Sequence, residues 1–187
     1  MEKYVLNNSI NQRELMDKEG LIKKLLEADQ EIALSHPNNR PINVVIGGGS
    51  VLIIQDLVDR QTIDIDVLGF YTDVEDVFNK HSINSRMNTF VDTQAENYLD
   101  RLIPLELNTK VIHYYLLSLE DLVIMKLFSG REKDYNDISS PNVIRNLNWD
   151  LLDKIIEDGE VDNSFNERRY KIFLDNYDRY KDKYKTS

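Results

Sequence analysis

Apolar residues recur along this chain with two different spacings, one typical of helices and one typical of strands. A helical spacing of leucines and isoleucines predicts a helix over residues 13–35, with Gly20 as a break that could divide it into two pieces. Helical and extended segments follow one another in mixed order, which favours an α/β fold. Short runs rich in β-branched and aromatic residues predict strands at 43–46, 62–67, 86–92, 98–107 and 110–117.

Helical patterns dominate the second half of the chain. Ser118 followed by Asp121 approximates a capping box, which predicts a helix that begins there and reaches a bend at Gly130. The tyrosine-rich face of the last helix is expected to pack against the body of the protein. We therefore expect a domain over residues 1–138 with an N-terminal helical segment, and a helical region at 139–187 packed on it. Further helices are predicted at 73–80 and 131–137, from Pro141, from Asn148 or Asp150 to Gly159, and at 165–183.

Three consecutive glycines, Gly47, Gly48 and Gly49, follow the predicted strand 43–46 at once. Because glycine has no Cβ, such a cluster lets the backbone bend sharply and approach a ligand closely. Ser50 can then cap a helix whose positive end and free N–H groups would face whatever the glycines hold. This stretch predicts a phosphate-binding turn.

Asp64 and Asp66 stand two positions apart on the next predicted strand, so their side chains share one face while Ile63, Ile65 and Val67 face the core. Neighbouring carboxylates repel each other unless a cation lies between them. Oxygen ligands suit a hard ion such as Mg²⁺, which keeps substrate phosphates in its coordination shell. A phosphate-binding turn joined by one helix to a magnesium-binding pair predicts phosphoryl or nucleotidyl transfer.

Other interpretations of this stretch fit less well. No Gly-Lys-Ser/Thr sequence follows the glycines, which excludes a P-loop, and the later glycine of a dinucleotide fingerprint is missing. In a purely structural interpretation, the glycines form a tight turn and the two aspartates lie solvated on an edge strand. Adjacent inward carboxylates flanked by isoleucines make that interpretation energetically costly.

Lys126 interrupts the apolar positions of the helix predicted after Ser118, where an unpaired ammonium group would be costly. It could reach a triphosphate or the carboxylates instead. Arg131, Lys133 and Asp134 follow the bend. They form either a solvated, salt-bridged helix end or part of the ligand site.

The composition narrows the choice of partners. The 187 residues carry a net charge of −10, which makes the chain a poor general binder of nucleic acid or of anionic membranes. The absence of cysteine excludes disulfides, thiolate zinc sites and cysteine nucleophiles. No apolar run is long enough to cross a membrane, and the N-terminus opens no signal peptide. A cytoplasmic protein without a membrane partner is therefore expected.

The ordered motifs Gly48-Gly49-Ser50 and Asp64-Ile65-Asp66, with a predicted helix between them, resemble the signature of the nucleotidyltransferase superfamily. The block 118–138 resembles a helix of small bacterial members, which include proteins linked to toxin–antitoxin and abortive-infection systems. The resemblance covers roughly residues 40–138. It implies the polymerase-beta-like fold, a small mixed sheet flanked by helices, here with a C-terminal helical part.

The resemblance also implies roles for individual residues. Asp64 and Asp66 would bind Mg²⁺ or Mn²⁺ together with a third carboxylate from a later strand. Asp100 and Glu106 are the candidates for that carboxylate, and the Asp-Arg-Leu sequence that begins at Asp100 favours Asp100. The nucleotide-binding residues would be Gly48, Gly49, Ser50, Lys126, Arg131 and Lys133.

We therefore predict a metal-dependent nucleotidyltransferase that moves a nucleoside monophosphate from an NTP, with ATP expected, to an acceptor and releases pyrophosphate. The acceptor would be RNA, a protein or a small molecule. One alternative is a catalytically weak or inactive nucleotidyltransferase-like binding protein, for example one component of a toxin–antitoxin pair with its cognate partner. A third prediction is a small-molecule modifier such as an antibiotic nucleotidyltransferase.

Overall fold

The protein folds around a five-stranded mixed sheet, with the strand order β3-β2-β1-β5-β4. The predicted α/β class, with helices around the sheet and further helices at the C-terminal end, is confirmed. The computed structural model describes residues 14–35, 41–69, 71–85, 93–161 and 167–185. Its strands are β1 (Ile42–Ile46), β2 (Ile65–Leu68), β3 (Ile83–Asn84), β4 (Ile103–Pro104) and β5 (Ile112–Leu116).

The central strand is β1, which runs parallel to β5 and antiparallel to β2. Its residues Val44 and Ile46 are fully buried, as a short β-branched run in the middle of a sheet requires. β3 extends the sheet in parallel beside β2, and Asp66 of β2 stands opposite Asn84. The strand that carries Asp66 therefore has a paired strand on both sides.

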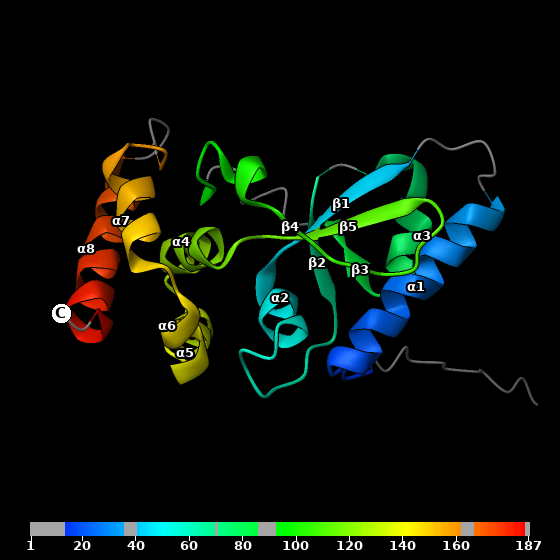
Figure 1. Cartoon of the computed structure of the whole chain (residues 1–187), viewed down its shortest axis with the longest axis horizontal. Coiled ribbons are helices and arrows are strands. Elements are labelled where there is room, and N and C mark those ends of the chain that lie inside the picture. Colours follow the sequence, from blue (N-terminus) through cyan, green and yellow to red (C-terminus); the bar gives the residue numbers. More distant parts are fainter. Residues whose placement is uncertain (1–13, 36–40, 70, 86–92, 162–166, 186–187) are drawn as a thin grey trace, which may run out of the picture.

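Three helices accompany this sheet: α1 (Lys18–Ser35), α2 (Gly48–Ile54) and α3 (Glu75–Lys80). Figure 1 shows α1 and α3 at the end of the sheet that lies away from α4. α1 continues through Gly20, so the expected break is absent. Its buried Asp29 accepts backbone N–H bonds from Lys110, Val111 and Ile112 at 2.8–2.9 Å, which fixes α1 to the start of β5.

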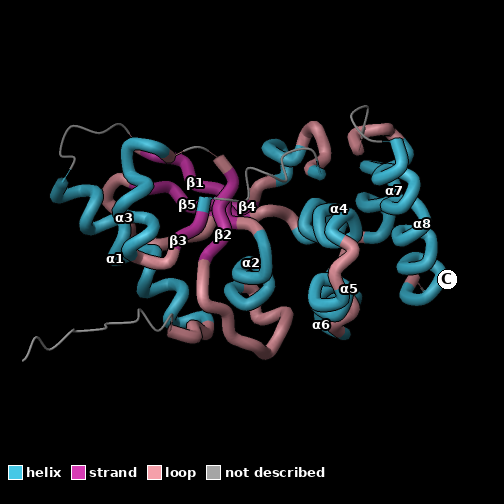
Figure 2. Tube along the Cα trace, turned by 180° about the vertical axis from the view of Figure 1, so that it is seen from behind, coloured by secondary structure: helices cyan, strands magenta, loops and turns pink. Residues whose placement is uncertain are grey.

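The second half of the described chain is helical. Ser118 caps α4 by accepting the N–H of Asp121, and Gly130 ends that helix in the left-handed region, as predicted. Figures 1 and 2 both place α4, α5 and α6 between the sheet and the pair α7 and α8. The helices are α4 (Leu119–Ser129), α5 (Glu132–Ile138), α6 (Pro141–Asn146), α7 (Trp149–Glu157) and α8 (Glu167–Tyr184).

α8 packs on α4 through its aromatic face, as expected. Phe173 and Tyr180 are fully buried, and the ring of Phe173 stacks on that of Phe128 at 4.1 Å between centroids. The expected division between residues 138 and 139 falls inside this helical group, because α5 packs on both α4 and α6. That division stays a prediction.

The segment 98–107 differs most from its prediction as a strand. Residues Tyr98–Arg101 form a 3₁₀ helix, η3, and only Ile103–Pro104 pair with β5. Arg101 holds this helix in place through side-chain hydrogen bonds to Asp121 and Glu160. Strand propensity, which is a local property, cannot predict such tertiary contacts. The strand β3 was not predicted, and the predicted strand 86–92 lies outside the described residues.

Candidate active site

A cavity of about 600 Å³ lies between the sheet and the helices α4 and α5. It has two polar walls that come from different halves of the chain. The sheet wall consists of Gly48, Gly49, Arg60, Asp64, Asp66 and Asn84. The helix wall consists of Lys126, Ser129, Arg131, Lys133, Asp134 and Asp137.

The glycine turn of the sheet wall stands directly against Asp66. Gly48 has φ +62°, and a Cβ at this position would lie 2.5 Å from Oδ2 of Asp66. A side chain is therefore excluded both by the backbone conformation and by contact. The N–H of Gly47 donates to the carbonyl of Asp66 at 2.9 Å, so the turn and the carboxylate strand are held as one unit.

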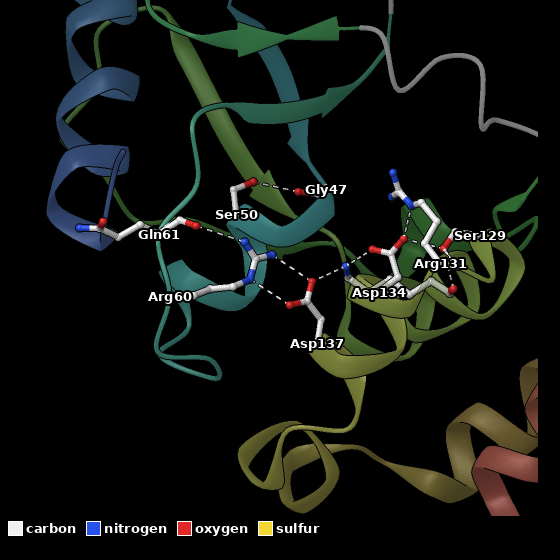
Figure 3. Close-up of polar contacts among 9 residues, drawn as sticks. Gly47, Ser50, Arg60, Gln61, Ser129, Arg131, Asp134 and Asp137 are labelled. Carbon is white, nitrogen blue, oxygen red and sulfur yellow. Dashed lines mark hydrogen bonds and ion pairs between the residues drawn. The ribbon is translucent and has the colours of Figure 1, made fainter. Parts of the chain in front are cut away.

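Ser50 has a different role from the predicted helix cap. The helix α2 begins at Gly48 with Gly47 as its N-cap, and the hydroxyl of Ser50 donates to the carbonyl of Gly47 at 2.9 Å. Ser50 is buried and is absent from the residues that line the cavity, among those that the structure describes. This hydrogen bond to Gly47 holds the turn against the first turn of α2 (Figure 3).

Asp64 and Asp66 line the same cavity as the glycine turn. Burial, followed by the negative charge of Asp64, raises the pKa of Asp66 to about 6, although a hydrogen bond from Asn84 opposes the shift. The Nδ2 of Asn84 donates to Oδ1 of Asp66 at 3.2 Å. Burial and the neighbouring carboxylate therefore outweigh the opposing effects of Asn84, Lys126 and Arg131 on the pKa of Asp66.

The flanking isoleucines only partly follow the predicted alternation. Ile65 and Val67 are fully buried, whereas Ile63 is 37% exposed and lines the cavity. The reason is that β2 begins at Ile65, so the strand alternation does not extend to Ile63.

The helix wall is organised around Lys126, which is buried. Its Nζ donates to Oδ1 of Asp134 at 2.7 Å and to Oδ2 of Asp137 at 2.8 Å. Asp134 also accepts bonds from the Ser129 hydroxyl at 2.5 Å and from Nε of Arg131 at 2.6 Å. Burial by itself would raise the pKa of Asp134, but the hydrogen bonds from Lys126 and Ser129 outweigh it and lower that pKa.

The salt-bridged interpretation of Arg131 and Asp134 is confirmed, and their part in a ligand site stays a prediction. Lys126 and Asp134 form buried ion pairs, and Arg131 joins them through its Nε. Arg131 and Lys133 are nevertheless exposed and line the cavity. The positive charge of Arg131 lowers the pKa of Asp66, although burial outweighs this effect.

Arg60 lines the cavity and was missed by sequence reasoning, as was Asn84. Arg60 lies in the loop between α2 and β2, where no periodic pattern marks it. Its guanidinium binds Asp137 through Nε and Nη2, both at 2.9 Å, and so links the sheet wall to the helix wall (Figure 3). The sequence does place this positive charge only a few positions before Asp64 and Asp66. Its ion-pair partner Asp137, however, lies 77 positions away, so the contact could not be inferred.

The structure does not bring Asp100 to the cavity. Asp100 lies on η3, is exposed, and is absent from the described residues that line the cavity, as is Glu106. The third carboxylate was expected from the family resemblance, which takes it from a later strand, but the predicted strand 98–107 is reduced to Ile103–Pro104. The position beside Asp66 on the neighbouring strand belongs to Asn84 instead.

Residues 23–185 match the sequence profile of a family described as a nucleotidyltransferase of unknown function (DUF6036). The chain belongs to this family. No curated protein and no solved structure matches it. The match covers both walls of the cavity and the C-terminal helices, so the whole site lies within the nucleotidyltransferase region.

Membership of a nucleotidyltransferase family implies an NTP substrate. The cavity volume of about 600 Å³ is large enough for a nucleotide, since small-molecule sites occupy roughly 300–1,000 Å³. In the part of the chain that the structure describes, no helix is both long enough and apolar enough to cross a bilayer.

The donor set of this nucleotidyltransferase cavity fits a magnesium ion only in combination with substrate. Asp64 and Asp66 are the carboxylates of the sheet wall, and both line the cavity, where their oxygens could bind a hard cation. Among the described residues, no group of three or more acidic or histidine side chains could hold a metal. Mg²⁺ commonly uses one or two carboxylates and takes its other ligands from phosphates and water.

Proposed function

We propose that this protein transfers a nucleoside monophosphate from an NTP to an acceptor hydroxyl or similar group. The observation that carries the proposal is the position of Asp64 and Asp66 beside the Gly48–Gly49 turn in one cavity. Family membership supports the same class of reaction. ATP is the NTP to test first.

The proposed roles follow from the two walls. Asp64 and Asp66 would hold Mg²⁺ or Mn²⁺, which when bound would neutralise phosphate charge and favour ionisation of the acceptor. The Gly48–Gly49 turn leaves the backbone open to the phosphates. Arg131 and Lys133 would supply charge toward the pyrophosphate. Lys126 would contribute less, because Asp134 and Asp137 already compensate it.

The reaction exchanges one bond for another at the α-phosphorus. The acceptor oxygen bonds to that phosphorus while the bond to the bridging oxygen breaks, and pyrophosphate leaves with the electron pair. The acceptor gives up its proton. Asp100 is not assigned a part in this scheme, because it is exposed and lies outside the described cavity lining.

The test is transfer of label from α-labelled NTPs to components of a cell extract, with Mg²⁺ or Mn²⁺ present. Nuclease or protease treatment of the products would identify RNA or protein acceptors, and label that resists both would indicate a small molecule. The double variant Asp64→Asn/Asp66→Asn should lose transfer by at least about a thousandfold, because it removes both anionic ligands without changing side-chain shape.

The matched control is Asp175→Asn/Asp178→Asn, which removes two exposed carboxylates from α8, outside the described cavity lining. It should transfer label as the wild type does. Transfer that persists in the double variant of Asp64 and Asp66 would contradict the proposal.

A second candidate function is nucleotide binding without transfer, as in one component of a toxin–antitoxin pair. The observation that favours it is Asn84 beside Asp66, where an acidic residue would have completed a set of three carboxylates. Calorimetry with ATP and Mg²⁺ would then show binding, while label would reach no acceptor in any extract. Co-expression with the product of the neighbouring gene would test for a cognate partner.

A further inference from the structure

Arg60 lies on the glycine turn itself. A Cβ at Gly49 would stand 2.0 Å from Nη2 of Arg60, so the guanidinium occupies the space that a side chain at Gly49 would need. Gly48, by comparison, is required by Asp66. The two glycines of the turn thus make room for one cationic and one anionic group, both of which line the cavity.

The guanidinium of Arg60 is held in place by acceptors that leave part of its capacity unused. Nε and Nη2 donate to the two oxygens of Asp137, and Nη1 donates to the carbonyl of Gln61 at 3.3 Å. Figure 3 shows Arg60 and Asp137 pointing toward one another across the cavity. An arginine has five N–H donors in a planar fork, so these three bonds leave two donors without an acceptor among the residues that the structure describes.

Asp137 in turn is nearly fully buried and shares its Oδ2 with Lys126. A buried carboxylate with two cationic partners is fixed in position. Arg60 is therefore oriented by α5, from the opposite wall of the cavity. A contact that served only to tie the loop to α5 would not need to lie against Gly49.

We propose that Arg60 binds the phosphates of the nucleotide and that Asp137 is the residue that positions it. Arginine suits this task because its planar fork matches phosphate oxygens. The proposal rests on the proposed function, since it assumes that the glycine turn receives the triphosphate. It adds a cation on the sheet wall to those of Arg131 and Lys133 on the helix wall.

The test compares ligands with and without phosphate. Arg60→Gln should weaken binding of ATP with Mg²⁺ by about 10- to 100-fold in calorimetry, the effect of losing a charged hydrogen bond. Binding of adenosine, followed by ligand-observed NMR, should be unchanged. Arg60→Lys, which keeps the charge but not the fork, should lie between the wild type and Arg60→Gln for ATP.

The matched control is Arg145→Gln on α6, an exposed arginine that is absent from the described cavity lining. It should bind ATP as the wild type does. Asp137→Asn should raise the KM for ATP more than it lowers kcat, and Asp137→Glu should restore part of the loss. A merely structural role for Asp137 would change the melting temperature without this separation of KM from kcat.

The outcomes separate this inference from the proposed function. If the wild type binds no NTP, the proposed function fails. If the wild type binds ATP and Arg60→Gln binds it equally well, the role of Arg60 is overturned while the proposed function stands. Equal weakening of adenosine and ATP would identify Arg60 as a purely structural residue and would also overturn the inference.

Discussion

Two pairs of aspartates face the same cavity from opposite walls, and they differ in how their charge is compensated. Asp134 and Asp137 on the helix wall are bound by Lys126, and each also binds an arginine. Asp64 and Asp66 on the sheet wall have no ion pair among the described residues. The pKa values differ accordingly, since that of Asp134 is lowered and that of Asp66 is raised to about 6.

This contrast separates a pair of aspartates that the protein itself binds from the pair that we propose to bind the metal ion. The helix-wall carboxylates are already satisfied and fix the relative position of α4, α5 and the loop that carries Arg60. The sheet-wall carboxylates have no ion pair among the described residues, and the raised pKa of Asp66 means that its ionised form destabilises the folded state. We therefore expect the two pairs to respond differently to substitution.

The largest expected effect comes from breaking the satisfied pair. Lys126→Met should lower the free energy of unfolding by about 3 kcal/mol at neutral pH, because it leaves buried carboxylates with reduced compensation. The value lies at the low end of the range for broken buried pairs, since Arg60 and Arg131 remain. The free energy of unfolding is measured by urea denaturation, and an unchanged m-value would show that the two proteins unfold in the same way.

Lys133→Met provides the matched control, because Lys133 is exposed on the same wall. Its effect on unfolding should stay within about 0.5 kcal/mol. A Lys126→Met protein as stable as the wild type would show that the helix-wall pair needs no buried cation, and the contrast between the walls would fail.

A substitution in the sheet-wall pair should change the free energy of unfolding in the opposite direction. In EDTA at about pH 8, Asp66→Asn should raise the free energy of unfolding by about 1–2 kcal/mol. This is less than the free energy that corresponds to the full pKa shift, because the cavity is open to solvent. The folded-state pKa of Asp66 lies above the ordinary value of 3.8, so protonation favours the folded state. The wild type therefore loses stability as the pH rises from about 4 to above about 6.

The difference between Asp66→Asn and the wild type should accordingly be near zero at about pH 4 and reach its maximum above about pH 6. Asp73→Asn, at an exposed position before α3, should show no such pH-dependent gain. If Asp66→Asn is no more stable than the wild type at high pH, Asp66 carries no uncompensated charge.

The glycine turn and the two aspartates of the sheet wall could be predicted from the sequence because they are close together in the chain, whereas Arg60 and Asn84 of the same wall could not. The glycines, α2 and the strand with Asp66 follow one another within residues 47–68, and local rules of turn, helix and alternation place them. The capped start of α4 at Ser118 was predictable for the same reason. Even here the local rules failed at Ile63, because tertiary pairing decides where β2 begins.

The contacts between the walls could not be predicted. The bond of Arg60 to Asp137 spans 77 positions, and no periodic pattern connects these two residues. The third carboxylate was sought on a strand that Arg101 instead holds as η3 through Asp121 and Glu160. Long-range ion pairs of this kind override local propensity, and a single sequence does not reveal them.

The smallest expected effect sharpens the contrast within the sheet wall itself. Asn84 stands opposite Asp66 and donates to it, so Asn84→Asp would add a third carboxylate beside the pair. Mg²⁺ affinity, measured by calorimetry, should rise about tenfold, while stability in EDTA should fall by about 1 kcal/mol through added repulsion. Asn79→Asp on the exposed face of α3 is the matched control and should change neither quantity. Unchanged Mg²⁺ affinity in Asn84→Asp would mean that the cation does not bind beside Asp66, and the assignment of the sheet wall as its site would have to be withdrawn.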